Sequence, residues 1–535
     1  MPDKTMVPPQ ASAFALLNRV TYGPTPSLRA DLEKLGWEAW VDQQLNPTEA
    51  DPDLQAIVAD FRYKLEIEVG KREVEREFPL ELYPRDTAGL LALVKGMEEP
   101  PDHVFRRPSF ETFLMTWLRM LHSQWQLQEI LAEFWHNHFN VSIEAHDYIP
   151  LVFPVWDREV IRKHTFGNFR TFLEATAKSP CMLLYLDNAF SRSGPANENY
   201  ARELFELHTL GAENYYNHLY DEWREVPGAG EGKAEGYIDE DVYEAARAFT
   251  GWTVGDGEEH DGGIRFPATG KFHYCDQWHD HYQKRVLGVE FRSHQGPERD
   301  GQRVLDLLAY HPGTARHLCQ KLCRWLVADE PPAALVERAT QVWQQNQKAP
   351  DQIAQVVRTI LLSPEFTESG CEKVKRPNHL IASLARSLGP VIKPGQVLYW
   401  WLREMGYSYF SFSAPTGHPD HAGHWLNTDM LLKRWNTMPL VLFADEDEGG
   451  MLQGRLTDQC ADTLDTPDKL IDFWSRRLLG KPAPERLHPG LKRVFAQEIE
   501  GATVPYLRKH HPDGFEFKVR QLVSLIALSP DFQTR

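Results

Sequence analysis

The sequence has few cysteines and no Cys-x-x-Cys pair. Its six cysteines are spread over 535 residues, which is too sparse for a disulfide framework and lacks the paired spacing of a zinc ribbon. Cys319 and Cys323 lie four residues apart in a helical pattern, where two small buried apolar side chains are the simpler explanation. Walker loops, Gly-x-Ser-x-Gly elbows and convincing dinucleotide fingerprints are also absent. We therefore expect no nucleotide cofactor, and serine hydrolase and Rossmann folds are disfavoured.

Long apolar runs and an excess of basic charge are missing as well. No run of about 18 apolar residues could span a bilayer, and the first residues lack the basic and apolar regions of a signal peptide. We expect a soluble, cytoplasmic protein. Lys plus Arg is 58 against 76 for Asp plus Glu, giving a net charge of −18, which disfavours nucleic acid and anionic membrane as partners.

Helical periodicity dominates the sequence, and clean alternating strand patterns are nearly absent. Near the N-terminus, we expect a first helix to end before Gly23-Pro24, a second to start after Pro26, and a third to run from Trp37 to a stop at Pro47. Two glycine-rich segments interrupt this pattern. They lie at 219–236 and 252–283, and we expect a short hairpin within the second.

The C-terminal half contains a weak internal repeat. Residues 303–368 and 466–533 each show a helix, a proline-rich break, a second helix and a helix stopped by Ser-Pro, an acidic residue and Phe. The sequence therefore predicts a mainly α fold, a large multi-helix assembly with a duplicated helical module and a few irregular or short β segments. The predicted domains are an N-terminal helical domain with the His, Glu and Asn motifs, a first module copy, and a His- and Pro-rich loop with the second copy, at 1–300, 301–385 and 386–535.

A first cluster of candidate functional residues lies in LQEILAEFWHNHFNVS. On a helix, Glu129, Glu133 and His136 recur at i, i+4 and i+7 and share a face. Glu133 and His136 form Glu-x-x-His, a spacing at which a carboxylate and an imidazole can bind one metal ion, as in carboxylate-bridged diiron bundles. In the simpler explanation, both glutamates face water and the histidines donate to carbonyls at the helix end.

A second cluster lies in PANENYARELFELHTLG. Asn199, Glu203 and Glu206 share one helix face, while Arg202 is spaced to pair with Glu198 and Glu206 on an exposed helix. If the helix is buried instead, the two face-sharing carboxylates need a cation, because unpaired buried charges are costly. That cation would be Arg202, Arg162 or a metal.

Two further histidine groups are weaker candidates. His279 and Asp280 form an adjacent pair that is typical of metal phosphohydrolases, but it lies in an irregular segment. His418, His421 and His424 repeat every three residues, which fits either a metal site or a hydrogen-bonding loop.

Nine motifs, in order, carry a family resemblance. They are FWHNHFNVS, DREVIRKHTFGNF, SPCMLLYLDN, NENYARELFELHTLG, YIDEDVYEAARAFTGW, HDHYQKRVLG, HPGTARHLCQKLCRWLV, LLSPEF and LSPDFQTR. Together they resemble the bacterial family catalogued as domain of unknown function 1800, over about Ala13 to Arg535. Family members are often exported and encoded beside a sulfatase-like protein, so the resemblance implies work on surface or extracellular polymers. It centres on His138, Asn197 to Glu206, and His279-Asp280, where we expect the site.

Three functional hypotheses follow. The first is an enzyme with a pocket between the two motif helices, metal-dependent and of the oxidative diiron or dimanganese type, with metal-assisted hydrolysis as its competitor. Its candidate ions are iron, manganese and zinc, and its candidate ligands are Glu129, Glu133, His136, His138, Glu203, Glu206, His208, His279 and Asp280. Its candidate catalytic residues are His138, Asn199, Arg202, Glu203 and Glu206.

The second hypothesis is a metal-free hydrolase that acts on a glycan, with Glu203 or Glu206 as general acid. The third is a non-catalytic helical scaffold that binds a protein partner, in which the polar motifs are buried networks that fix helix packing. The candidate substrate of the enzyme hypotheses is a polysaccharide or another polymer.

Overall fold

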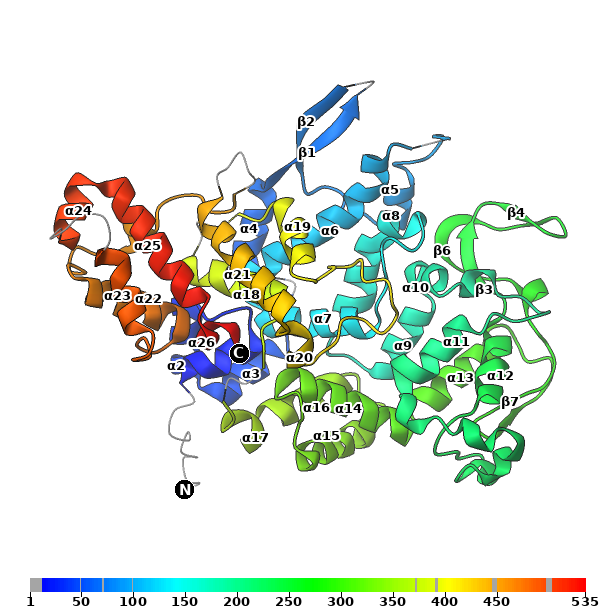
Figure 1. Cartoon of the computed structure of the whole chain (residues 1–535). Coiled ribbons are helices and arrows are strands. Elements are labelled where there is room, and N and C mark those ends of the chain that lie inside the picture. Colours follow the sequence, from blue (N-terminus) through cyan, green and yellow to red (C-terminus); the bar gives the residue numbers. More distant parts are fainter. Residues whose placement is uncertain are drawn as a thin grey trace.

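Short helices and one hairpin form the N-terminal part of the computed structural model, which describes residues 12–48, 50–69, 72–98, 100–370, 373–389, 393–444, 450–496 and 503–535 (Figure 1). These elements are α1 (Ala13–Val20), α2 (Pro26–Leu35), α3 (Trp37–Gln44), α4 (Pro52–Asp60), β1 (Arg62–Val69) and β2 (Arg72–Pro79). The three helices predicted for this region are confirmed. Thr25 caps α2, and Pro26 occupies its first turn, where the missing N–H costs nothing.

The middle of the chain carries the motif helices. They are α5 (Thr87–Leu91), α6 (Asp102–His122), α7 (Gln126–His138), α8 (Tyr148–Val155), η1 (Trp156–Arg162), α9 (Phe169–Ala177), α10 (Pro180–Tyr185), α11 (Asn199–Glu203), η3 (Leu204–Thr209) and α12 (Asp239–Phe249). The segments η1 and η3 are π-helical turns that continue α8 and α11. Such turns are rare and are frequent at functional sites.

Small antiparallel sheets follow α12. Their strands are β3 (Trp252–Asp256), β4 (Glu259–His260), β5 (Ile264–Arg265), β6 (Ala268–Tyr274), β7 (Lys284–Val286) and β8 (Val289–Phe291). The pairs are β3 with β6, β4 with β5, and β7 with β8. The hairpin expected within 252–283 is therefore present.

The C-terminal half is again helical. Its helices are α13 (Arg299–Ala309), α14 (Pro312–Leu326), α15 (Ala333–Gln345), α16 (Gln352–Leu361), α17 (Pro364–Thr367), α18 (Pro377–Leu388), α19 (Val397–Glu404), α20 (Ala422–Trp425), α21 (Thr428–Phe443), α22 (Pro467–Leu479), α23 (His488–Ala496), α24 (Val504–His510), α25 (Pro512–Ala527) and α26 (Pro530–Gln533). The protein is mainly α-helical, as the sequence predicts. Within the described ranges, no helix has the length and apolar character needed to cross a bilayer.

Helix α18 lies at the centre of the molecule. All of its residues are buried, and it contacts α6, α21 and α22. One hydrophobic cluster includes residues from α1 through α26. The core therefore joins helices from all three predicted segments. In the repeat, α17 and α26 are single turns after Ser-Pro, and their Phe366 and Phe532 side chains are both buried.

The hairpin of β1 and β2 extends away from the helices at the top of Figure 1. This hairpin is not among the predicted elements. RYKLEIEV of β1 alternates charged and apolar residues, whereas REVEREFP of β2 does not. Tyr63 and Ile67 of β1 are buried. Because one face of β1 is buried, apolar residues are needed at every second position. The many charged residues of the segment make this alternation hard to recognise in the sequence.

The loop from 405 to 421, between α19 and α20, is fastened to the end of α7. Asn137 donates to the His418 carbonyl at 3.0 Å and accepts from the His418 N–H at 2.8 Å. Asn140 donates to the carbonyls of Phe412 and Ala414 at 3.0 and 2.8 Å. Two side-chain amides thus replace the secondary structure that this loop lacks.

Gly417 in this loop is expected to tolerate no side chain. Its φ is +67°, and a Cβ there would lie 2.2 Å from the Asn137 carbonyl oxygen. Changing Gly417 to alanine should destabilise the folded chain by about 1–3 kcal/mol, because left-handed strain and the clash add, and should speed proteolytic cleavage of the loop. Gly423→Ala is the matched control, since a Cβ there meets nothing within 4 Å. Equal cleavage rates in both variants would contradict this expectation.

Candidate functional site

Arg162 joins two buried carboxylates beneath α7. Its Nη1 lies 2.8 and 2.7 Å from the two oxygens of Glu129, and its Nε donates to Asp157 at 2.8 Å. Asp157 is also 2.8 Å from Nε2 of His136. Asp157 is fully buried, and Glu129 and Arg162 are 4% and 8% exposed. The predicted ligands Glu129 and His136 are therefore held in one ion-pair network.

The network sets the charge states of its members. Burial alone would raise the pKa of Asp157, but the Arg162 guanidinium and the His136 imidazole hold it well below its ordinary value. Burial lowers the pKa of His136 in spite of Asp157. The carboxylate thus stays ionised as the acceptor between the two nitrogen groups.

Glu133 belongs to a different network. Tyr22 donates its hydroxyl to one oxygen of Glu133, Tyr407 donates to the other at 2.9 Å, and Arg376 lies 3.8 Å away. Glu133 is 5% exposed. The simpler explanation, in which Glu129 and Glu133 face water, is therefore wrong, and the two halves of the Glu-x-x-His motif bind separate partners.

The donor groups of the metal hypothesis do not converge. In the parts of the chain that the structure describes, no three His, Cys, Asp or Glu side chains gather closely enough to hold a metal ion. Glu129, Glu133 and His136 are already bound by other side chains. The residues present do not fit a metal site, and metal dependence stays a prediction.

His138 and His208 do lie together, as expected for the two motif helices. Their ring centroids are 6.1 Å apart, and Nε2–H of His138 donates to the His208 carbonyl at 3.2 Å. Lys321 of α14 donates from Nζ to Nδ1 of His138 at 2.8 Å. Both histidines are buried, and burial lowers the pKa of His208 to about 3. The imidazoles are therefore neutral.

Lys321 is a candidate that sequence reasoning missed. Burial lowers the pKa of its ammonium to about 8, so it is easier to deprotonate than an ordinary lysine. A signal was available in the sequence, because Lys321 lies three residues after Leu318 and four before Trp325. Both of these side chains are buried in α14, so the helical period places Lys321 beside the apolar stripe.

Glu203 and Glu206 differ from the other predicted carboxylates. Both are half-buried around the start of η3, and within the described ranges neither forms a hydrogen bond or an ion pair. Burial raises the pKa of Glu203, and the charge of Glu206 raises it further. Asn199 on the same helix is exposed.

Arg202 offsets the charge of this pair only in part: its charge acts to lower the pKa of Glu203, but among the described residues it forms no ion pair with Glu203 or Glu206. It forms ion pairs with Glu198 at 3.2 Å, as predicted, and with Asp239 of α12 at 3.0 Å. The predicted pair with Glu206 does not form among the described residues. The reason is long-range packing, since α12 lies against α11 and offers Arg202 a closer carboxylate.

Another motif residue, Tyr185, interacts with the charge of Glu203. Burial raises the pKa of the Tyr185 phenol to about 12, and the charge of Glu203 contributes to that increase. Tyr185 donates to the Ser413 carbonyl at 2.8 Å and accepts weakly from Asn140 at 3.4 Å. Tyr185 thus connects α10, the end of α7 and the 405–421 loop.

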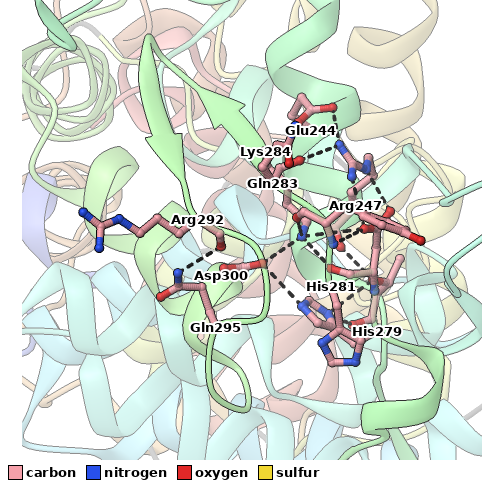
Figure 2. Close-up of polar contacts among 12 residues, drawn as sticks. Glu244, Arg247, His279, His281, Gln283, Lys284, Arg292, Gln295 and Asp300 are labelled. Atoms are coloured by element: carbon pink, nitrogen blue, oxygen red, sulfur yellow. Dashed lines mark hydrogen bonds and ion pairs between the residues drawn. The ribbon is translucent and has the colours of Figure 1, made fainter.

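The His279-Asp280 motif has a structural explanation. Figure 2 shows His279 and Lys284 both pointing to Asp300, at 3.4 and 2.8 Å, and Arg247 holds Asp280 at 2.8 and 3.1 Å. Lys284 is 2% exposed, so this network is buried. These side chains connect α12, α13 and the segment before β7.

The histidines of the 405–421 loop also separate. His418 is buried and stacks on Tyr407 with ring centroids 4.4 Å apart, whereas His421 and His424 are exposed. The hydrogen-bonding explanation fits His418 best, because its backbone pairs with Asn137.

These features describe a mainly α-helical protein in which several motifs are buried ionic networks. One motif, around η3, presents a carboxyl pair that has no hydrogen-bond or ion-pair partner among the described residues. The family model described as protein of unknown function (DUF1800) matches residues 15–534. The chain therefore belongs to this family, and the predicted membership is confirmed. No curated protein and no solved structure shows significant similarity to it.

Proposed function

We propose that the protein is a hydrolytic enzyme whose acid–base groups are Glu203 and Glu206. The observation that carries this proposal is the state of these two carboxyls. They are half-buried, three residues apart and unpaired within the described ranges, whereas Glu129, Glu133 and Asp280 are each bound by basic or phenolic side chains. Leaving carboxyls partly desolvated costs stability, and a catalytic role explains why such a cost is kept.

The environment of the pair separates two chemical roles. Burial and the neighbouring charge favour the protonated form of Glu203, which suits a general acid that gives its proton to a leaving oxygen. Glu206 would then act as base toward water or as nucleophile. The leaving group departs as an alcohol, and water supplies the hydroxyl to the cleaved carbon, so the reaction balances as hydrolysis.

The position on a π-helical turn supports this assignment. A π turn adds one residue to a helical turn and is frequent at functional sites. The substrate class proposed for this pair is a glycan or a similar polymer with cleavable C–O bonds. Tyr185, from another family motif, interacts with the charge of Glu203 and is hydrogen-bonded weakly by Asn140 from a third motif.

A polymer screen tests the proposal. Purified protein is incubated with soluble polysaccharides, and new reducing ends are measured. Wild type should release them, and the double variant Glu203→Gln/Glu206→Gln should lose at least about 100-fold of that activity, in line with the loss of acid–base catalysis. Glu198→Gln, on the same helix and paired with Arg202, is the matched control and should stay active.

Two outcomes would contradict the proposal. One is full activity in the double variant. The other is the absence of activity on every polymer, which would favour the scaffold hypothesis. Elemental analysis of the same sample tests the metal hypothesis. A stoichiometric content of iron, manganese or zinc, together with loss of activity after chelation, would favour a metal-dependent mechanism over acid–base catalysis by the carboxyl pair.

A further inference from the structure

A cavity of about 710 Å³ lies between β1, the first half of α6 and α19. These elements come from distant parts of the sequence and lie near one another in Figure 1. The volume falls in the range of about 300–1,000 Å³ that ligand sites occupy. Glu203, Glu206, Tyr185 and Asn140 are not among the residues that line this cavity.

Several aromatic side chains line this groove. Trp400 is 56% exposed, and the Tyr399 ring lies edge-on to it, with centroids 5.8 Å apart and an interplanar angle of 82°. Phe110 and Phe410 also line the groove. A large indole left in solvent at the mouth of a cavity gives a flat apolar face that a ligand can cover.

The acidic and basic side chains that line the groove are nearly balanced in charge. Arg106 donates to Asp102 at 2.8 Å and to Glu144 at 2.9 Å, so its guanidinium is held in place with oxygen atoms on both sides. Arg403 is exposed, and no carboxylate among the described residues forms an ion pair with it. The wall therefore offers fixed donors and acceptors with little net charge.

We propose that this groove binds an oligosaccharide chain. A sugar ring has apolar C–H faces that can cover Trp400 and hydroxyls that can both donate to carboxylates and accept from arginines. A purely apolar ligand would strip water from the charged groups of the wall, which is costly. A nucleic acid would meet Asp102 and Glu144 on a chain of net charge −18.

The inference does not depend on the chemistry proposed at Glu203. The groove is formed by its own residues, and binding is measured without turnover. Saccharide binding should therefore be unchanged in the Glu203→Gln/Glu206→Gln variant. If the groove binds saccharide and the polymer screen shows no hydrolysis, the proposed function fails and this inference stands. If the screen shows hydrolysis and the groove binds no saccharide, this inference fails and the proposed function stands.

Isothermal titration calorimetry of the whole chain tests the groove. The probes are hexasaccharides of glucose, xylose, mannose, N-acetylglucosamine and galacturonic acid. At least one should bind with a Kd below about 1 mM, and Trp400→Ala should weaken it at least tenfold. Trp435→Ala, which removes a 47% exposed indole on α21 outside the groove, is the matched control and should bind like wild type.

The two sugar types give distinct results. Binding of a neutral hexasaccharide that survives Arg403→Gln supports recognition by stacking and hydroxyl contacts. Binding of the galacturonate alone, lost in Arg403→Gln, assigns an acidic saccharide to the same groove. The inference is overturned if none of the five probes binds, or if Trp400→Ala binds as tightly as Trp435→Ala.

Discussion

Replacing Arg162 by leucine is expected to lower the free energy of unfolding by about 3–5 kcal/mol. The change removes the cation between Glu129 and Asp157 and leaves two carboxylates buried without it. Breaking a buried ion pair from one side has this large cost because the partner charge stays buried. Glu129 loses the guanidinium that binds both of its oxygens, and Asp157 keeps Arg119 at 3.6 Å, the His136 imidazole and the Tyr83 hydroxyl. The shift in denaturation midpoint, measured by circular dichroism or by pulse proteolysis, reports the loss.

Arg476→Leu is the matched control for this experiment. Arg476 pairs with Asp472 at 2.8 Å on the surface of α22, where both side chains are about half exposed. Exposed pairs of this type contribute at most about 1 kcal/mol. If the two variants are destabilised equally, the assignment of Arg162 as the central cation is wrong.

The deficit of the Arg162 variant should depend on pH. In the wild type, the pKa of Asp157 lies below its ordinary value of 3.8, so its stabilising contribution is present above that value and is lost as the pH falls through the folded-state pKa. In the variant, Asp157 loses the Arg162 charge that helps to lower its pKa, so it gains a proton more easily. The difference between the two proteins should therefore be largest near pH 7 and shrink toward pH 4. A constant difference over that window would argue against the mechanism.

Glu203→Gln should lower kcat/KM by about 10²- to 10⁴-fold on a substrate identified by the polymer screen. Glutamine has nearly the same shape but carries no transferable proton, so the general-acid contribution is lost while binding is kept. KM should change little. Glu198→Gln again serves as control, and an equal loss in both variants would indicate a structural effect on α11.

Glu206→Gln is expected to shift the pH dependence of kcat/KM. After burial, the charge of Glu206 is a cause of the raised pKa of Glu203. Without that charge the pKa of Glu203 falls, so the general acid loses its proton at lower pH. The pH at which kcat/KM begins to decline on the alkaline side should move down, whatever the residual rate. If the alkaline limb of the kcat/KM pH profile stays in place or moves to higher pH, Glu203 is not the general acid.

Local structure was well predicted from the sequence because its causes are local. The helix boundaries near Pro26 and Trp37 depend on proline, glycine and capping residues within a few positions. The hairpin of β1 and β2 was missed because its charged residues mask a weak alternation, and a two-stranded hairpin depends on packing by residues such as Tyr63 against α6.

The sequence could not predict which side chains of different helices pair with one another. The sequence named Arg162 as a cation for buried carboxylates, but it pairs with Glu129 and Asp157 rather than with Glu203. Spacing along one helix restricts which side chains share a face, while the approach of a second helix decides which of them meet. Lys321 shows the same limit, because only the packing of α14 on α7 brings it to His138.

In the π-helical turn η3, the positions of the side chains depend on how many residues the turn contains as well as on which residues they are. Each residue of an α-helix advances the chain by about 100°, and Leu204–Thr209 holds a wider turn in the same helix. Because the wide turn already holds one extra residue, deleting a residue there would close it to a regular α-helical turn and change the angle between Glu203 and Glu206 around the helix axis. Inserting a further residue would instead rotate buried His208 by about 100° away from its place beside His138. Single-residue insertions and deletions in this turn should thus be tolerated far less than substitutions on its surface.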